Sequence, residues 1–412
     1  MNNSWIYNCI SERLGGALFE KNSGYKFEII KQVKKVFIES HPNIALIDFG
    51  IGDPNDIAPK CAIETLEEYS HKWQYGGYAD NGAEFFKASI CKYMRSLFHI
   101  EDLTHENILP ILGIKSGLCL LAGALINEND LVAYTVPGYG VFATQTQYLL
   151  GKTLPLKLTR ENNFLPDLKS LSEEIKKNIK ILVLNYPNNP TGAVATKQFF
   201  EEIVHLALKY HWIVIHDAAY SALSFETPIS ILEILNAKAC CIELHSMSKG
   251  FNMTGWRIGW LCGNKTIVKA CEMYKTNCDS GQFLAIQKAA CEALKIEKDW
   301  LPPLRDKYKL RLSHLVDILN RYGFNVSMPK AGFFLYVRAP QKAIKSEQKF
   351  TFTNAEECSH WFLTQLGIVV VPWDESGKFL RFSVTFRTND ETNFFKELVH
   401  RLKDYTFLFE NN

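Results

Sequence analysis

The sequence lacks several features that mark common classes of protein. It contains no C-x-x-C pair, no Lys/Arg-rich block, no internal repeat and no low-complexity tract. Closely spaced cysteine pairs are typical of zinc and redox sites, and basic blocks are typical of proteins that bind nucleic acid or anionic membranes. We therefore expect neither nucleic acid nor a membrane as a partner, and a small molecule is the better candidate ligand.

The beginning of the chain also lacks the basic and then apolar layout of a signal peptide. Its eleven cysteines are scattered, which fits a reducing compartment where thiols stay unpaired. One apolar run, from Ile108 to Ile126, approaches membrane-spanning length, but Lys115, Ser116 and three glycines interrupt it. We expect a cytoplasmic protein with this run in its interior.

What is present is the composition of an ordinary folded protein. The chain has 412 residues, of which 47% are hydrophobic and 22% charged, and its formal net charge is +2. From about residue 110 to 265, helical patterns alternate with short apolar runs, namely LVAYTV, KILVLNYP, WIVIHDAAY, CIELHSMS and IGWLCG. Strands separated by helices indicate βαβ units. We predict an α/β fold with a large, mostly parallel sheet.

The pattern changes near residue 300 and suggests a second unit. A charged helical stretch leads there into AGFFLYVR and KFLRFSVTF, which are typical of strands in an α+β unit. The first 60 residues have too few apolar runs to fold alone, so we expect them to pack with this unit. The predicted division is an N-terminal arm with part of the small domain (1–60), a large α/β domain (61–298) and a small α+β domain (299–412).

Ligands of open α/β sheets usually lie beyond the carboxyl ends of the strands, so polar residues that follow apolar runs are candidates. One run ends in NYPNNPTGA, and another ends at Asp217 with Tyr220 three residues later. Each has an ordinary interpretation: Asn, Pro and Gly form turns, and a lone Asp often caps a helix.

Two further stretches have the same mixture of functional and ordinary interpretations. The stretch HSMSKGFNMTGWRIGW sets Lys249 among serines, with Arg257 eight residues later, although a single Lys or Arg in a loop is usually a solvated charge. The stretch GIKSG, which begins at Gly113, precedes an apolar helical pattern. A glycine turn at the start of a helix can hold a phosphate through backbone N–H groups, but this motif is short.

The ordered combination of these four motifs resembles the fold-type I aminotransferases, which use pyridoxal phosphate. That cofactor needs a lysine for its aldehyde, a partner for its ring nitrogen and an anchor for its phosphate, because its ring accepts electrons from a substrate carbanion. The resemblance implies that Lys249 forms the Schiff base and moves protons, and that Asp217 pairs with the ring nitrogen. Asn189 and Tyr220 would hydrogen-bond the phenolic oxygen of the cofactor, with Tyr220 as a catalytic candidate.

The same resemblance assigns the remaining site residues. The implied phosphate ligands are the side chains of Ser246, Ser248 and Arg257 and the backbone N–H groups of Ile114, Lys115 and Ser116. Tyr139 would stack on the cofactor ring, although it can also be read as a core tyrosine. The implied substrate ligands are Arg381, placed just before a strand and facing the α-carboxylate, together with Asn189 and Gly52; a simple glycine turn is the alternative for Gly52.

Longer segments are similar to those of the LL-diaminopimelate aminotransferases: NYPNNPTGAVAT, ELHSMSKGFNMTGWRIG, NCDSGQFLAIQKA and VPWDESGKFLRFSVTF. This similarity implies a homodimer with shared active sites, in which Tyr25 reaches substrate and Tyr78 reaches the cofactor phosphate of the partner. Tyr75 remains a rival for Tyr78, because the spacing to Gly82 departs from the commoner pattern. Ser280 is a substrate-binding candidate where the better-known branch carries asparagine.

Other functions stay open at this point. A general aminotransferase for aspartate, alanine or aromatic amino acids would share most of these residues. A carbon–sulfur lyase would share Lys249, Asp217 and Arg257. A ligand sensor or structural dimer on the same fold is a third alternative, although intact catalytic candidates argue against it. We expect amino acids and 2-oxo acids as substrates, and the sequence predicts no metal site.

Overall fold

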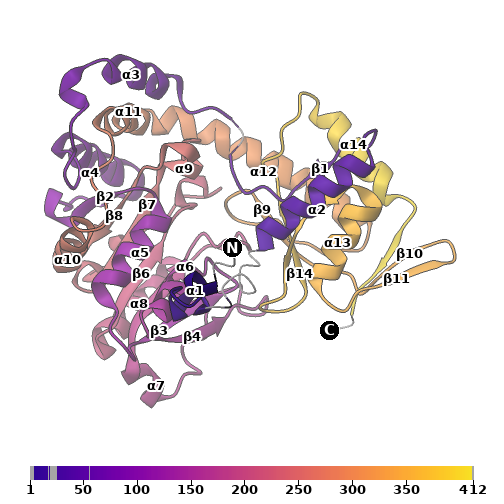
Figure 1. Ribbon diagram of the computed structural model, residues 1–412, viewed down its shortest axis with the longest axis horizontal. Coiled ribbons are helices and arrows are strands. Elements are labelled where there is room, and N and C mark those ends of the chain that lie inside the picture. The colour runs from indigo at the N-terminus through magenta and orange to yellow at the C-terminus, as the bar shows by residue number, and fades with distance from the viewer. Residues whose placement is uncertain (1–3, 17, 19–25, 55, 411–412) are drawn as a thin grey trace.

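The computed structural model describes residues 4–16, 18, 26–54 and 56–410. Figure 1 shows a larger α/β part that carries the seven-stranded sheet and a smaller part that contains the chain after about residue 320. A long helix, α12 (Glu297–Arg321), runs from the larger part into the smaller one.

The larger part is built around one sheet of seven strands. In spatial order these are β2 (Ile108–Ile111), β8 (Gly259–Gly263), β7 (Cys241–Ser246), β6 (Ile213–Asp217), β5 (Ile179–Asn185), β3 (Leu131–Val136) and β4 (Lys152–Lys157). Only β8 runs antiparallel to its neighbours. The predicted mostly parallel sheet is confirmed, and each predicted apolar run in this region forms one of its strands.

Helices cover both faces of this sheet. They are α4 (Glu84–Phe98), α5 (Ile114–Leu125), α6 (Val141–Tyr148), α8 (Lys197–Tyr210), α10 (Lys265–Lys275) and α11 (Leu284–Lys295). The larger part also contains α3 (Lys60–Ser70), which packs on α11, and the short helices α7 (Glu173–Asn178) and α9 (Met247–Gly250). One buried apolar cluster joins the sheet to α5, α6 and α10, and another joins it to α4, α8 and α11. Because both faces are buried, the parallel strands are continuous apolar runs rather than alternating ones.

Short 3-10 helices connect several of these elements. They are η1 (Glu12–Leu14), η3 (Trp73–Tyr75), η4 (His105–Asn107), η5 (Ser221–Leu223), η6 (Ile231–Glu233), η7 (Ala237–Ala239) and η8 (Thr254–Trp256). The apolar run after Ile108 forms β2 and α5, both largely buried. Among the described residues, no helix has both the length and the apolar character needed to cross a membrane.

The smaller part contains short sheets and two helices. Its antiparallel sheets are β13 (Val371–Trp373), β14 (Phe379–Ser383) and β9 (Phe334–Arg338), and β11 (Gln348–Thr351), β10 (Lys342–Lys345) and β15 (Thr406–Leu408). The helices α13 (Ala355–Leu366) and α14 (Glu391–Leu402) share one apolar cluster with β9, β14 and α12. Arg381 lies in the middle of β14, so the prediction that it precedes a strand is wrong.

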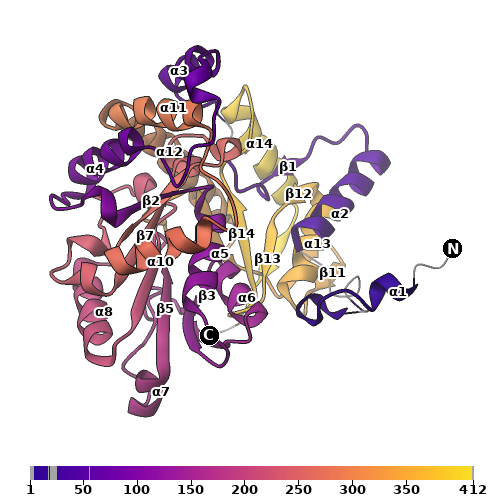
Figure 2. The same cartoon turned by 60° about the vertical axis from the view of Figure 1, so that its left-hand side comes forward.

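The N-terminal segment contributes α1 (Ser4–Tyr7), α2 (Lys26–Ser40) and β1 (Ile47–Asp48). Strand β1 pairs in parallel with β12 (Ile368–Val369). Phe37 of α2 packs with Leu363 and Val369. Figures 1 and 2 both show α2 beside α13, so α2 and β1 lie against the smaller part.

Candidate active site

A cavity of about 500 Å³ lies at the carboxyl ends of β5, β6 and β7. This volume is within the usual range for sites that bind small molecules. The cavity is lined by these predicted site residues: Gly52, Ile114, Lys115, Tyr139, Asn189, Asp217, Tyr220, Ser246, Ser248, Lys249, Arg257 and Arg381. The fold therefore brings together residues that are more than 300 positions apart in the sequence.

Three predicted site residues within the described part of the chain do not line this cavity. Ser116 lies on α5 next to residues that do. Tyr78 is 93% exposed, and Ser280 is exposed with its carbonyl accepting a hydrogen bond from Lys275 Nζ at 3.1 Å. Tyr25 lies outside the described residues.

Lys249 lies in α9, a single helical turn that follows β7 directly. Ser246, the last residue of β7 rather than a loop residue after it, begins the turn by accepting the N–H of Ser248 at 3.0 Å. Lys249 Nζ donates to the carbonyl of Gly52 at 2.9 Å and to Asp53 Oδ1 at 3.2 Å. Burial lowers the pKa of Lys249, and the opposing attraction of Asp53 does not cancel this effect. A lysine of this kind reaches its neutral, nucleophilic form more readily.

Asp217 ends β6 and is only 3% exposed. Burial raises the pKa of its carboxyl to about 6, although Oδ1 accepts the N–H of Ala219 at 3.1 Å and the positive charge of His216 acts in the opposite direction. The side chain of Asn185 donates to the Asp217 carbonyl at 3.1 Å. A positively charged group or an N–H donor in the cavity would therefore stabilise the ionised carboxyl of Asp217, which lies in the cavity wall.

An anion-binding end of the cavity forms where α5 begins. The first N–H groups of a helix have no partner within the helix and attract anions. Arg257 lies here, with Nη1 donating to the carbonyl of Thr254 at 2.9 Å and Nη2 donating to that of Leu112 at 3.2 Å. Gly113 has a φ of +83°, and a Cβ there would lie 2.6 Å from Arg257 Nη2. Glycine is required for this approach.

Arg381 lies on the opposite side, in β14 of the smaller part. Its guanidinium is buried, with Nη1 donating to Asn189 Oδ1 and Nη2 to the carbonyl of Gly50, both at 3.2 Å. The group stacks over the ring of Phe334, with 4.3 Å between Cζ and the ring centroid. A Cβ on Gly52 would lie 3.1 Å from the Phe334 ring and 3.6 Å from Arg381 Nη2. This crowding supports a specific role for Gly52 rather than a generic turn.

Two tyrosines complete the cavity wall. Tyr220 is buried and packs edge-on against Phe333 and Phe334, and this burial raises the pKa of its phenol. Tyr139 is 36% exposed and lines the cavity, so it is not a core tyrosine.

The sequence analysis missed several residues of this cavity, including Asp53 and Asn185. Asp53 directly follows Gly52 and contacts Lys249. Asn185 is the last residue of β5, and its Oδ1 accepts the N–H of Asn189 at 3.0 Å. Both could have been found from the sequence. Asp53 follows the predicted site residue Gly52, and Asn185 ends a predicted strand. The α2 residues Ile30, Lys31 and Lys34 gave no such signal, because only the tertiary fold brings them to the cavity.

Comparisons with known proteins place the chain in a family. A family model described as "Aminotransferase class I and II" matches residues 44–401. The chain is 44% identical to an LL-diaminopimelate aminotransferase from Methanocaldococcus jannaschii over 94% of this chain and 92% of that protein. It is 41% identical to one from Methanococcus maripaludis over 99% of this chain and all of that protein.

Solved structures agree with this similarity. Substrate-bound BacF from Bacillus subtilis has a TM-score of 0.84 and 27% identity over 94% of this chain and 96% of that chain. An aminotransferase from Staphylococcus aureus has a TM-score of 0.80 and 28% identity over 87% and 93% of the two chains. The chain belongs to the class I and II aminotransferases.

Proposed function

We propose that this enzyme is a pyridoxal-phosphate-dependent LL-diaminopimelate aminotransferase. It would interconvert tetrahydrodipicolinate, glutamate and water with LL-diaminopimelate and 2-oxoglutarate, in the synthesis of lysine and peptidoglycan precursors. The observation that carries the catalytic part is the convergence of Lys249, Asp217 and Arg257 on one cavity. The substrate is supported by the two relatives of that name, which match the chain over nearly its whole length.

The donors and acceptors around the cavity fit pyridoxal phosphate. Arg257 and the start of α5 form the anion-binding end, where Ser246, Ser248 and the N–H groups of Ile114, Lys115 and Ser116 would assist in holding a phosphate. The carboxyl of Asp217 suits a protonated ring nitrogen, and Lys249 supplies the amine that an aldehyde requires. Tyr139 would stack on the ring, and Asn189 and Tyr220 would hold its phenolic oxygen. When bound, the cofactor supplies an electron sink for the substrate carbanion.

Lys249 has two tasks in this proposal. Its lowered pKa increases the share of neutral amine, which is the form that reacts with a carbonyl carbon and accepts a proton. Once the Lys249 amine is free again, it would take the proton from the substrate Cα and deliver it to a second carbon of the reacting group. The charged form is held by Gly52 and Asp53, so these contacts define the resting position of the amine.

Arg381 would bind the α-carboxylate of each substrate. The planar guanidinium presents two donors to two carboxylate oxygens, and the Phe334 ring beneath it fixes its plane. Its present contacts, Asn189 Oδ1 and the Gly50 carbonyl, hold it in place for this task. Gly52 would leave room for the substrate beside it.

The proposal includes a cytoplasmic homodimer with shared active sites. Large side chains are exposed in one segment of the chain: Ile51, Ile57, Trp73 and Tyr78. A second subunit would cover them. Of the two rival tyrosines, Tyr75 packs edge-on against Tyr69 with 4.7 Å between ring centroids, whereas Tyr78 projects into solvent. We therefore propose that Tyr78 reaches the cofactor phosphate of the partner, and that Tyr25 and Ser280 complete the substrate site.

The substrate assignment is tested with purified enzyme and added cofactor. Glutamate formation from 2-oxoglutarate is measured with LL-diaminopimelate, aspartate and alanine as donors, and kcat/KM is compared. We expect LL-diaminopimelate to be the best donor. A higher kcat/KM for aspartate or alanine would support the general aminotransferase instead, and release of pyruvate and ammonia from cystathionine without a 2-oxo acid would indicate a lyase.

A further inference from the structure

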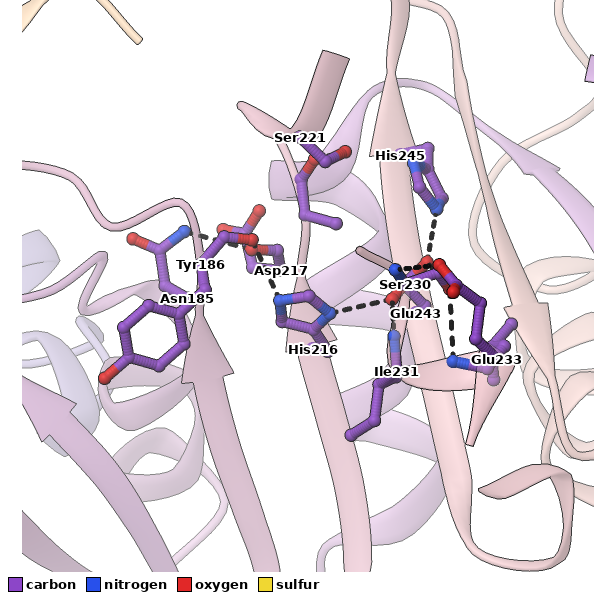
Figure 3. A network of polar contacts seen from close by, with 12 residues as sticks. Asn185, Tyr186, His216, Asp217, Ser221, Ser230, Ile231, Glu233, Glu243 and His245 are labelled. Atoms are coloured by element: carbon purple, nitrogen blue, oxygen red, sulfur yellow. Dashed lines mark hydrogen bonds and ion pairs between the residues drawn. The ribbon is translucent and has the colours of Figure 1, made fainter. Parts of the chain in front are cut away.

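A cluster of buried ionisable side chains lies beside Asp217 and has no part in the mechanism above (Figure 3). It consists of His216 on β6 and Glu243 and His245 on β7, with Ser230 and the start of η6. His216 directly precedes Asp217, and successive side chains of a strand point to opposite faces of the sheet. Asp217 lines the cavity, so the cluster occupies the reverse face.

Glu243 accepts four hydrogen bonds. Oε2 receives them from His216 Nδ1 at 2.8 Å and from the N–H of Ile231 at 2.9 Å. Oε1 receives them from Ser230 Oγ at 2.6 Å and His245 Nε2 at 2.7 Å. The Ser230 hydroxyl oxygen already accepts the N–H of Leu232, so its hydrogen is directed to Glu243. An ionised carboxylate offers about four acceptor positions, and all of them are used here.

His216 is held between two acceptors. Nε2 lies 2.9 Å from the carbonyl of Tyr186, which can only accept, so Nε2 carries a hydrogen. Nδ1 shares the remaining proton with Glu243. The proton resides on the imidazole, because a histidine is more basic than a glutamate by about two pKa units and three other donors stabilise the carboxylate. His216 is therefore a buried cation.

We infer that Glu243 is a positioning residue, which holds His216 as a buried cation and thereby favours the ionised form of Asp217. This inference rests on the proposed function, in which ionised Asp217 pairs with the protonated ring nitrogen. Glu243 lies on the neighbouring strand, behind the cavity wall, and would act through His216 alone.

The electrostatics of the surrounding groups agree with this role. Burial acts to raise the pKa of Glu243, but the positive charge of His245 and the hydrogen bonds from both histidines outweigh it and lower that pKa. His245 stacks on Trp260 and makes its contact through a single Nε2 hydrogen. The other ionisable groups facing Glu243 are Glu233, Cys241 and Cys262, and burial raises the pKa of Glu233 and Cys262. Both shifts favour the neutral forms of Glu233 and Cys262.

The experiment compares the full-length wild type with Glu243→Gln and Glu243→Asp. Side-chain ¹⁵N NMR reports whether both ring nitrogens of His216 carry hydrogens, and ¹³C NMR of labelled aspartate follows the titration of Asp217 in the cofactor-free protein. In the wild type we expect both His216 nitrogens to carry hydrogens, because each lies within hydrogen-bond distance of an acceptor. Glu243→Gln should raise the Asp217 midpoint by about one pH unit, and Glu243→Asp should restore part of the difference.

Cofactor affinity provides a readout that a folding defect would not reproduce. For Glu243→Gln, we expect about fivefold weaker binding of pyridoxal phosphate at the wild-type Asp217 midpoint and equal binding at about pH 9, where Asp217 is ionised in both proteins. An unprotonated His216 nitrogen in the wild type, or an unchanged Asp217 midpoint in Glu243→Gln, would overturn the inference. If Glu243→Gln fails to fold, the ¹⁵N spectrum of the wild type still tests whether both ring nitrogens of His216 carry hydrogens. None of these readouts uses a substrate, so their failure is distinct from failure of the substrate assignment.

Discussion

Lys249 and Asp217 are buried ionisable groups whose pKa values burial moves in opposite directions. Burial disfavours the charged form of each, so the amine is neutral more readily and the carboxyl holds its proton more tightly. The lowered pKa of Lys249 favours the nucleophilic amine. The raised pKa of Asp217 means that its ionised form needs a cationic partner.

Replacing Lys249 with alanine removes the reacting amine. We expect kcat for transamination to fall by about 10³-fold or more, because nucleophile and proton carrier are lost together. The comparison uses Lys269→Ala, which removes an exposed lysine of α10 and should leave kcat unchanged. A Lys249→Ala enzyme with a rate near that of the wild type would refute this role.

Asp217→Asn should lower activity and raise the stability of the cofactor-free protein. Since folding raises the pKa of Asp217 from 3.8 to about 6, ionised Asp217 costs about 3 kcal/mol above pH 6, and this cost disappears as the pH falls toward 4. The variant should therefore be more stable at about pH 8, by up to that amount, and by less at about pH 5. Chemical unfolding at both pH values measures this change.

The control for Asp217→Asn is Asp102→Asn, which removes an exposed carboxylate that pairs with Lys238. It should bring no gain in stability at either pH. The free-energy gain for Asp217→Asn must shrink on acidification, and a gain that grew toward pH 5 would contradict the sign of the shift. In the same variant we expect kcat to fall by about 100-fold or more, since the ring nitrogen loses its charge partner.

Arg381→Lys should raise KM for every amino-acid substrate. An ammonium cannot form the planar two-donor contact with a carboxylate, and kcat/KM should fall by about 10- to 100-fold. Arg401→Lys is a matched control, because Arg401 donates to carbonyls of Ala45, Leu366 and Gly367 away from the cavity. It should lower stability and leave KM unaltered. Equal KM values for Arg381→Lys and the wild type would count against the assigned role.

Among the elements, the turn between β2 and α5 sets the anion-binding end of the cavity. The sequence identified Gly113 as a weak glycine motif, and the structure adds its reason: φ is +83° and the Arg257 guanidinium lies where a Cβ would be. The five inner strands of the large sheet were predictable because burial on both faces produces continuous apolar runs, whereas the edge strand β4 is largely exposed and was not predicted. The short strand β14 was harder to delimit, which is why Arg381 was placed before it.

Gly113→Ala tests the role of this turn. The added methyl would displace Arg257 and strain the backbone, so we expect about tenfold weaker binding of pyridoxal phosphate with smaller effects on global stability. Gly255→Ala is the control, since a Cβ at Gly255 would meet no atom within 4 Å. Unchanged cofactor affinity in Gly113→Ala would show that the close approach of Arg257 is not needed.

For the whole molecule, the predicted division at residues 60 and 298 stays a prediction. Helix α12 spans the second boundary, with Leu301 in a cluster of the larger part and Leu304 in that of the smaller part. The contribution of Lys31, Lys34 and Asp48 to the cavity could not be read from the sequence, because their approach depends on how the N-terminal segment packs.

The proposed dimer predicts different effects for two nearby tyrosines. Tyr78→Phe should weaken cofactor binding by about tenfold, the usual effect of losing one hydrogen bond to a charged group. Tyr75→Phe should have little effect, because the Tyr75 ring packs on Tyr69 of its own chain. Sedimentation velocity should report a dimer under assay conditions. An active monomer with unchanged affinity in Tyr78→Phe would contradict the shared site.

We propose Lys249 as the reaction centre of a pyridoxal phosphate enzyme. Three other lysines, Lys31, Lys34 and Lys115, also line the cavity, so the position of the reacting lysine can be tested directly. The enzyme is incubated with pyridoxal phosphate, reduced with borohydride and digested, and the labelled peptide is identified by mass spectrometry. We expect a phosphopyridoxyl label on Lys249. A label on one of the other three lysines, or no stable label, would contradict it.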